Sequence, residues 1–164
     1  IGLAANIQHI KLKGKTTARR RAYLTSNREM ARIYQQTQAT THPGLLYYHW
    51  SRNNDETALT RLLALENTAE VETSAEMQFY LASYYIKVDE HKAIGFLYNT
   101  LALNQAKQVP DPEIYTSLIS LFYKHHQYKH AYIFAKIAEF SGIKNIDILL
   151  IEQQLIAQGK NLES

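Results

Sequence analysis

The stretch that decides the fold runs from residue 81 to residue 94: Leu81-Ala82-Ser83-Tyr84-Tyr85 and, after three intervening residues, Asp89-Glu90-His91-Lys92-Ala93-Ile94. The first segment is apolar and aromatic. The second opens on an aspartate, a residue type that caps helix N-termini. Few residues separate the two segments, and short connections make neighbouring helices antiparallel. The stretch therefore predicts a helical hairpin.

The same pattern recurs on both sides of this hairpin. Ala58 lies 35 residues before Ala93, and Ala131 lies 38 residues after it. Two rings lie nine and eight residues before each alanine: His49 and Trp50, Tyr84 and Tyr85, Phe122 and Tyr123. A small residue lets two helices approach, and a ring fills the space beside it. One hairpin cannot bury its apolar face alone, so we expect the three to stack.

The whole chain of 164 residues has 6 Gly and 3 Pro, too few turn residues for a many-stranded sheet protein. Helical spacing, with cap signals at Thr73, Asp89, Asp111, Gly142 and Gly159, predicts nine helices, over 3–12, 17–39, 43–52, 55–66, 74–87, 90–104, 112–125, 128–141 and 146–158. The expected fold is all-α, a short right-handed solenoid of antiparallel hairpins in one domain, 1–164. It comprises a basic N-terminal helical pair over 1–40, where Ala18 and Ala22 suggest a degenerate hairpin, three hairpins over 41–142 and a capping helix over 143–164.

Residues 40–142 resemble tetratricopeptide (TPR) and Sel1-like repeats, which implies an α-solenoid. The small residue usual on the first helix of such a repeat is replaced by Leu46, Leu81 and Ile119. The stretches Lys13-Gly14-Lys15-Thr16-Thr17-Ala18-Arg19 and Leu45-Leu46-Tyr47-Tyr48-His49-Trp50 also resemble an uncharacterised proteobacterial family, some of whose members are described as lipoproteins. This second resemblance implies the periplasmic side of the bacterial envelope rather than the cytoplasm, and peripheral or lipid-anchored membrane association.

The chain has no cysteine, which excludes disulfides and thiolate metal sites, and it lacks the standard catalytic strings. His125, His126 and His130 are close in sequence, but a turn between them favours turn residues over a metal site. Asp55 is better explained as a helix cap than as an acid–base partner of His49. We therefore expect no enzyme, no metal and no cofactor.

The aromatic positions give the first candidate site. Trp50, Tyr85 and Tyr123 occupy equivalent positions that lie towards the concave face in TPR-like arrays. With their neighbours on that face they define a candidate peptide- or protein-binding groove: Tyr47, Trp50, Gln78, Tyr85, Thr116 and Tyr123. Aromatic residues that line a groove suit peptide recognition. The alternative is that the rings only stack between hairpins.

The N-terminal segment gives the second candidate site. Residues 1–32 carry eight basic side chains and one acid, a charge of +7, so the remainder carries −4 of the total of +3. Arg21, Arg28 and Arg32 share one helical stripe and form a candidate anion-binding surface. The alternatives are a solvated face, an acidic protein partner, phosphates of nucleic acid or acidic lipid, or self-association into a homo-oligomer. An acidic cluster at residues 66–76 disfavours nucleic acid.

The first functional hypothesis is a non-enzymatic scaffold or adaptor that binds a protein or peptide. The alternative is an anion-binding protein that uses the basic N-terminal helix on nucleic acid or an acidic membrane surface.

Overall fold

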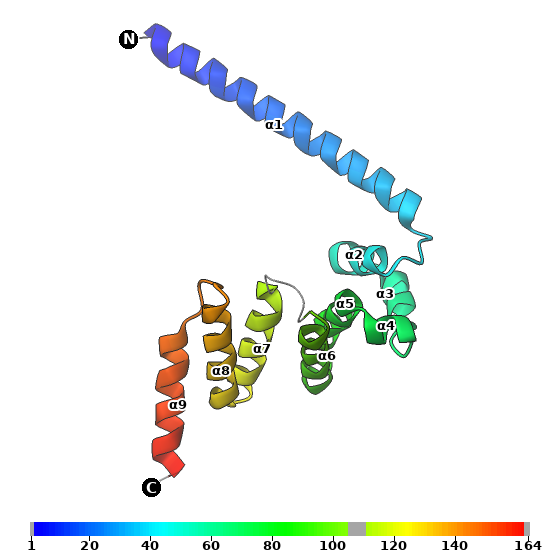
Figure 1. The fold of residues 1–164 in the computed structure, drawn as a ribbon. Coiled ribbons are helices and arrows are strands. Elements are labelled where there is room, and N and C mark those ends of the chain that lie inside the picture. Colours follow the sequence, from blue (N-terminus) through cyan, green and yellow to red (C-terminus); the bar gives the residue numbers. More distant parts are fainter. Residues whose placement is uncertain (1, 105–110, 163–164) are drawn as a thin grey trace. The chain divides into compact units, whose positions relative to one another are not determined.

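The computed structural model describes the backbone of residues 2–104 and 111–162, and the side chains of residues 15–104 and 111–159. Across these residues it is all-α, with nine helices and no strand, as predicted (Figure 1). The chain divides into two compact units, residues 1–59 and residues 60–164, with the boundary inside one helix.

Unit 1 begins with one long helix, α1 (Gly2–Thr37). The prediction of two helices over 3–12 and 17–39 is wrong, and with it the helical pair and the degenerate hairpin at Ala18 and Ala22. The structure continues the helix across residues 13–16, because a glycine such as Gly14 inside a helix costs only about 1 kcal/mol and does not end it. No proline lies in this segment to stop the helix.

Two short helices follow, α2 (Pro43–Asn53) and the start of α3 (Glu56–Leu63). Proline in the first turn of α2 suits a position whose N–H needs no partner. Asn54 ends α2 in the left-handed conformation, with φ of 53°. Asp55 caps α3 as predicted, since its Oδ1 accepts from the N–H groups of Thr57 and Ala58, both at 3.0 Å.

A buried histidine joins α1 to α2. His49 is 1% exposed, and its Nε2 lies 2.9 Å from Thr37 Oγ1. The Tyr34 ring packs edge-on against the imidazole, with ring centroids 4.9 Å apart. The Tyr34 hydroxyl donates to Asp55 Oδ2 at 2.9 Å. The last turns of α1 are therefore anchored by polar contacts to α2 and to the cap of α3.

Unit 2 comprises the end of α3 and six further helices: α4 (Ala69–Thr73), α5 (Ala75–Tyr85), α6 (Glu90–Leu103), α7 (Pro112–Lys124), α8 (Tyr128–Phe140) and α9 (Ile148–Leu162). Helix α5 packs on α6, and α7 packs on α8, each across a short turn. Helices α6 and α9 pack on α7 and α8, respectively. Figure 1 shows α7, α8 and α9 running alternately down, up and down.

The helix ends follow local cap chemistry. Asp89 and Asp111 cap α6 and α7 as predicted, each by accepting a backbone N–H at 3.0 Å. The cap predicted at Thr73 lies one residue later, because Ser74 accepts from the Met77 N–H at 3.3 Å. Gly142 follows the end of α8 at φ of 79°, a conformation that favours glycine. The stop predicted at Gly159 is wrong, since α9 continues through it.

The alanines that defined the sequence pattern are core residues. Ala58, Ala93 and Ala131 are all 0% exposed. Leu97 and Ala135, four residues after the last two alanines, are also 0% exposed. In unit 2 these residues belong to a hydrophobic core that runs from α5 to α9. Burying one large aliphatic side chain contributes about 1.5–3 kcal/mol, so this core dominates the stability of the unit.

Candidate functional site

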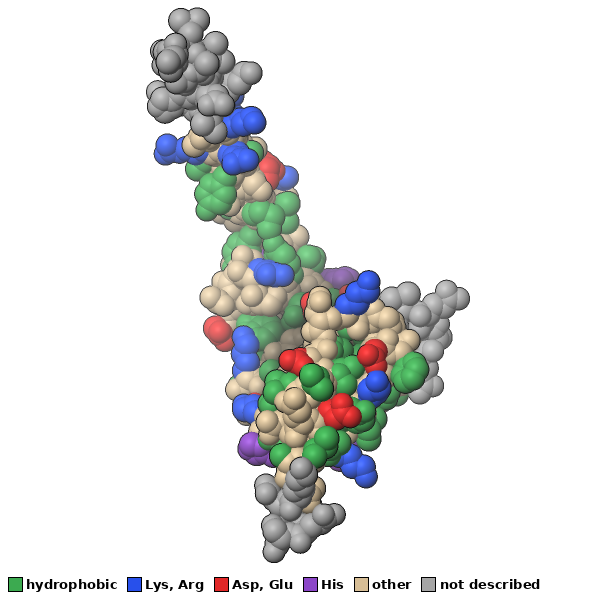
Figure 2. Space-filling view, turned by 90° about the vertical axis from the view of Figure 1, so that its left-hand side faces the viewer, with side chains coloured by type: hydrophobic (Ala, Val, Ile, Leu, Met, Phe, Trp, Pro, Cys, Tyr) green, Lys and Arg blue, Asp and Glu red, His purple; other side chains and the backbone are tan. Residues whose placement is uncertain are grey.

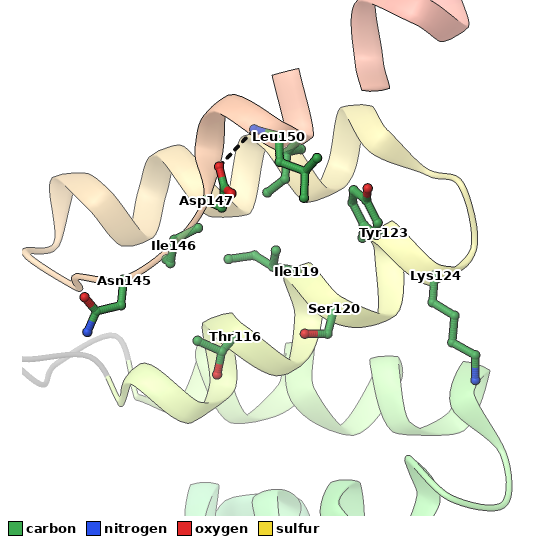
Figure 3. Close-up of a pocket in the computed structure, with 10 residues that line it drawn as sticks. Thr116, Ile119, Ser120, Tyr123, Lys124, Asn145, Ile146, Asp147 and Leu150 are labelled. Carbon is green, nitrogen blue, oxygen red and sulfur yellow. Dashed lines mark hydrogen bonds between the residues drawn. The ribbon is translucent and has the colours of Figure 1, made fainter. Parts of the chain in front are cut away.

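An open hollow lies between α7 and α9, with a volume of about 350 Å³. The turn before α9 also contributes to its lining, which comprises Thr116, Ile119, Ser120, Tyr123, Lys124, Asn145, Ile146, Asp147, Leu150 and Ile151. Figure 3 shows Ile119, Ile146 and Leu150 converging on the space between the two helices, with Tyr123 at one side. The hollow is therefore mainly apolar with a polar margin, which is the usual character of a site that takes an apolar side chain.

A second hollow, of about 420 Å³, lies on the other side of α7. It shares Thr116, Ser120 and Lys124 with the first, and is completed by Ile86, Glu90, Ser117 and Leu121. Because three residues of α7 line both, the two hollows adjoin along this helix, and together they are called the α7 groove below. Its α9 side has no charged pair, whereas its α6 side adds the charged pair of Glu90 and Lys124 to an apolar lining of Ile86 and Leu121.

The α6 side of the α7 groove carries a network of charges. Glu90, in the first turn of α6, forms an ion pair with Lys124 of α7. The second carboxylate oxygen of Glu90 lies 2.7 Å from His125 Nε2. The Lys124 hydrogen bond, with a smaller contribution from His125, lowers the pKa of Glu90 below its usual value. This wall therefore presents both a carboxylate and an ammonium group.

The local sequence fixes the geometry of the groove. Asp147 caps α9 by accepting the Leu150 N–H at 3.0 Å, the dashed contact in Figure 3. Asn145 turns the chain just before this cap, with φ of 68°. Ile151 is 4% exposed and fastens the first turns of α9 to the core. The position of α9 beside the groove therefore depends on the Asp147 cap and on the contact of Ile151 with the core.

The structure brings together two of the six predicted groove residues. Thr116 and Tyr123 both line the α7 groove. Tyr47 and Trp50 belong to unit 1, where their rings lie 5.9 Å apart and Trp50 is 9% exposed.

Gln78 and Tyr85 are engaged within unit 2. Gln78 is 4% exposed, and its amide donates to the Val71 carbonyl at 3.0 Å. The Tyr85 ring stacks on Phe96 with centroids 5.5 Å apart, and its hydroxyl donates to Glu66. Burial, followed by the Glu66 hydrogen bond, raises the pKa of the Tyr85 hydroxyl. For these two residues the contacts match the packing alternative rather than a free groove.

Sequence reasoning missed the apolar side of the groove. Ile146 and Leu150 lie in a segment that the repeat pattern treated only as a cap. Ile119 was noticed because it is large where TPR-like repeats have a small residue. In the structure it is 8% exposed, and its side chain forms part of the hollow. The bulky residue at this position was therefore the sequence signal from which the apolar side of the groove could have been predicted.

The three predicted anion-binding residues lie on α1. Arg21, Arg28 and Arg32 are all exposed. Arg32 also pairs along its own helix, with Nε 2.8 Å from Glu29 and a guanidinium nitrogen 3.0 Å from Gln36. The helix also exposes large apolar residues, among them Tyr23 at 66% and Met30 at 47%.

The histidines near the end of α7 have separate partners. His125 faces Glu90, His126 Nδ1 lies 2.7 Å from the Tyr128 hydroxyl, and His130 stacks on Phe122 with centroids 5.1 Å apart. Within the described residues, no group of three histidines, cysteines or acids can hold a metal ion. In that same part of the chain, no helix is long and apolar enough to cross a membrane.

The fold and the groove define an all-helical protein with an open depression across one of its helices. Residues 1–136 match the family described as "Protein of unknown function (DUF2989)", and the chain belongs to this family. The matched range includes most of the α7 groove and stops before α9. Neither the curated proteins nor the solved structures contain a significant match to the chain.

Proposed function

We propose that this protein is a non-enzymatic binding module that takes a peptide segment of a protein partner in the α7 groove. The observation that carries the proposal is the open, mainly apolar hollow between α7 and α9, on the same helix as the Glu90–Lys124 pair. A peptide that crosses α7 would place an aliphatic or aromatic side chain against Ile119 and Leu150. Its neighbouring polar groups would meet the hydroxyls of Thr116 and Ser120.

The repeat pattern supports this reading. Buried alanines in α3, α6 and α8, and the α5–α6 and α7–α8 pairs, are what a TPR-like stack of hairpins requires. We propose the right-handed solenoid as the arrangement of these hairpins. The envelope location implied by the sequence resemblance stays a prediction.

The test is a peptide-display selection against the wild-type chain, followed by titration of the selected peptides into two variants. Ser120 is exposed and lines both hollows, so Ser120→Arg should fill the groove without disturbing the core. Ser51→Arg makes the same change at an exposed position of α2 and serves as the control. We expect Ser120→Arg to weaken binding at least tenfold while Ser51→Arg leaves it unchanged. Equal binding by both variants would remove the α7 groove from consideration.

The second candidate function is anion binding by α1, because Arg21 and Arg28 are exposed on one stripe of a basic helix. On duplex DNA, each phosphate contact lowers the logarithm of the binding constant by about 0.9 for every tenfold rise in salt concentration. The test compares duplex DNA with vesicles of anionic lipid. Arg21→Glu with Arg28→Glu should abolish binding, whereas Arg52→Glu, at an exposed position of α2, should not. A wild-type chain that binds neither probe at low salt would exclude this function.

A further inference from the structure

The outer side of α8 and α9 exposes two apolar stripes. On α8, Ile133, Ile137 and Phe140 follow each other at intervals of four and three residues and are 44%, 41% and 88% exposed. On α9, Leu149 and Ile156 lie seven residues apart and are 65% and 52% exposed. Residues three, four or seven apart share one side of a helix, so each set forms a continuous stripe.

Charged residues lie between the two stripes. Lys136 of α8 forms an ion pair with Glu139. Glu139 is the main cause of the raised pKa of Lys136, and Glu152 of α9 adds to it. Because α8 and α9 pack together and their charges interact here, the stripes belong to one surface, called the α8–α9 face below. Figure 2 views the side on which α9 lies and shows apolar side chains there interspersed with acidic and basic ones.

The α8–α9 face differs from the α7 groove. Successive residues of an α-helix are rotated by about 100°, so Leu149 and the groove residue Leu150 project in different directions. Ile151, which is 4% exposed, marks the side of α9 that enters the core. Helix α9 therefore has a core side, a groove side and an apolar outer side.

We propose that the α8–α9 face binds the same face of a second copy of this chain, with the two α9 helices antiparallel about a two-fold axis close to Gln153. In that arrangement Leu149 of each copy lies opposite Ile156 of the other. Gln153, between them on the same stripe, meets its own counterpart. A glutamine amide both donates and accepts hydrogen bonds, so it complements itself across such an axis.

Two properties of the face favour a second copy over another occupant. The first is charge. Lys136, Glu139 and Glu152 place both signs on one surface, and a two-fold rotation can bring unlike charges together. An anionic membrane or a strongly charged partner would instead require a face whose charges are all of one sign.

The second property is area. At roughly 180 Å² for each large side chain, exposed fractions of 41–88% amount to about 500 Å² of apolar surface. The polar side chains between the stripes add to this. A standard interface buries about 800 Å² per partner, so the α8–α9 face has the size for a dimer.

The first experiment measures the mass of the full chain by light scattering after size exclusion. The wild-type chain should have twice the 18.9 kDa of one copy at tens of micromolar concentration. Leu149→Glu with Ile156→Glu should give one copy with unchanged helicity, because both residues are exposed. Leu24→Glu with Met30→Glu makes the same charge change at exposed positions of α1, 56% and 47% exposed, and should stay dimeric.

The second experiment uses the absence of cysteine from the chain. Gln153→Cys should form a covalent dimer rapidly on mild oxidation. Leu149→Cys should not, because the antiparallel pairing displaces its two copies by roughly 10 Å along the helices, beyond the ~7 Å that a disulfide spans. A mixture of Leu149→Cys and Ile156→Cys should cross-link again. A wild-type monomer, a dimer lost with the α1 variant, or equal cross-linking at Gln153 and Leu149 would each overturn the proposal.

Discussion

Substitution of Tyr85 tests whether this residue packs within the fold or recognises a partner. A packing residue contributes to the free energy of unfolding, whereas a residue that only recognises a partner does not. Its ring stacks on Phe96, and Lys92 Nζ lies 4.1 Å from the ring centroid. The Lys92 ammonium also donates to the Tyr85 hydroxyl at 2.8 Å, and that hydroxyl donates to Glu66. We expect Tyr85→Ala and Tyr85→Phe to destabilise the protein by different amounts, because only the first removes the ring.

The magnitudes follow from these contacts. Truncation of a fully buried aromatic residue to alanine costs about 3–5 kcal/mol, and Tyr85 is half-buried, so Tyr85→Ala should cost about 2 kcal/mol. Tyr85→Phe keeps the stacking and leaves Glu66 paired with Lys92. It removes hydroxyl hydrogen bonds worth about 0.5–1.5 kcal/mol each when buried. Partial exposure lowers that, so the expected loss is below about 1 kcal/mol.

The assay is urea denaturation of the full chain followed by far-UV circular dichroism. With a slope of about 1–3 kcal/mol per molar urea, the alanine variant should shift the midpoint by roughly 1 M and the phenylalanine variant by less than half of that. Tyr23→Ala, at a position 66% exposed on α1, is the control and should leave the midpoint in place. If Tyr85→Ala behaves like Tyr23→Ala, the ring contributes no packing energy and the reasoning fails.

Three other predictions concern the core and the caps. Leu97→Ala in α6 should cost about 2–5 kcal/mol because the residue is 0% exposed, whereas Leu103→Ala in the same helix, 41% exposed, should cost less than about 1 kcal/mol; urea midpoints measure both. Asp89→Ala should cost about 1 kcal/mol and Asp89→Asn much less, since asparagine also caps helices; equal thermal shifts for the two variants would contradict the cap. The hydrogen bond from the Ala58 N–H is the main cause of the lowered pKa of Asp55. The ionised carboxylate therefore stabilises the folded chain above the unfolded pKa of about 3.9, and this stabilisation is lost as the pH falls below that value. Melting temperatures between about pH 3 and pH 6 should therefore depend less on pH in Asp55→Asn than in wild type.

The all-helical class and most helix ends were predictable because local chemistry fixes them. The caps at Asp55, Asp89 and Asp111 act within three residues of themselves, so the sequence alone reveals them. The buried alanines were found because their spacing repeats. The continuity of α1 was not predictable for the converse reason: whether a helix continues through a segment that includes a glycine depends on a balance of about 1 kcal/mol, which the residue type alone does not decide.

The candidate site was less predictable because distant segments build it. Thr116 and Tyr123 were identified from their position on one helix, which is local information. Ile146 and Leu150 become lining residues only once α9 packs on α8 and faces α7 across the hollow, and no repeat spacing records that arrangement. Gln78 and Tyr85 were assigned to a surface, but specific polar partners, Val71 and Glu66, hold them within the fold.

The residues that build the hollow between α7 and α9 are different from the residues at its rim that the proposed peptide would touch. Ile119 and Ile151 are nearly buried and belong to the core, whereas Thr116, Ser120 and Leu150 at the rim are exposed. Exposed positions ordinarily tolerate substitution within about 0.5 kcal/mol. The rim residues can therefore be exchanged while the scaffold persists, so the peptide specificity proposed for the α7 groove depends on positions that carry little of the fold's stability.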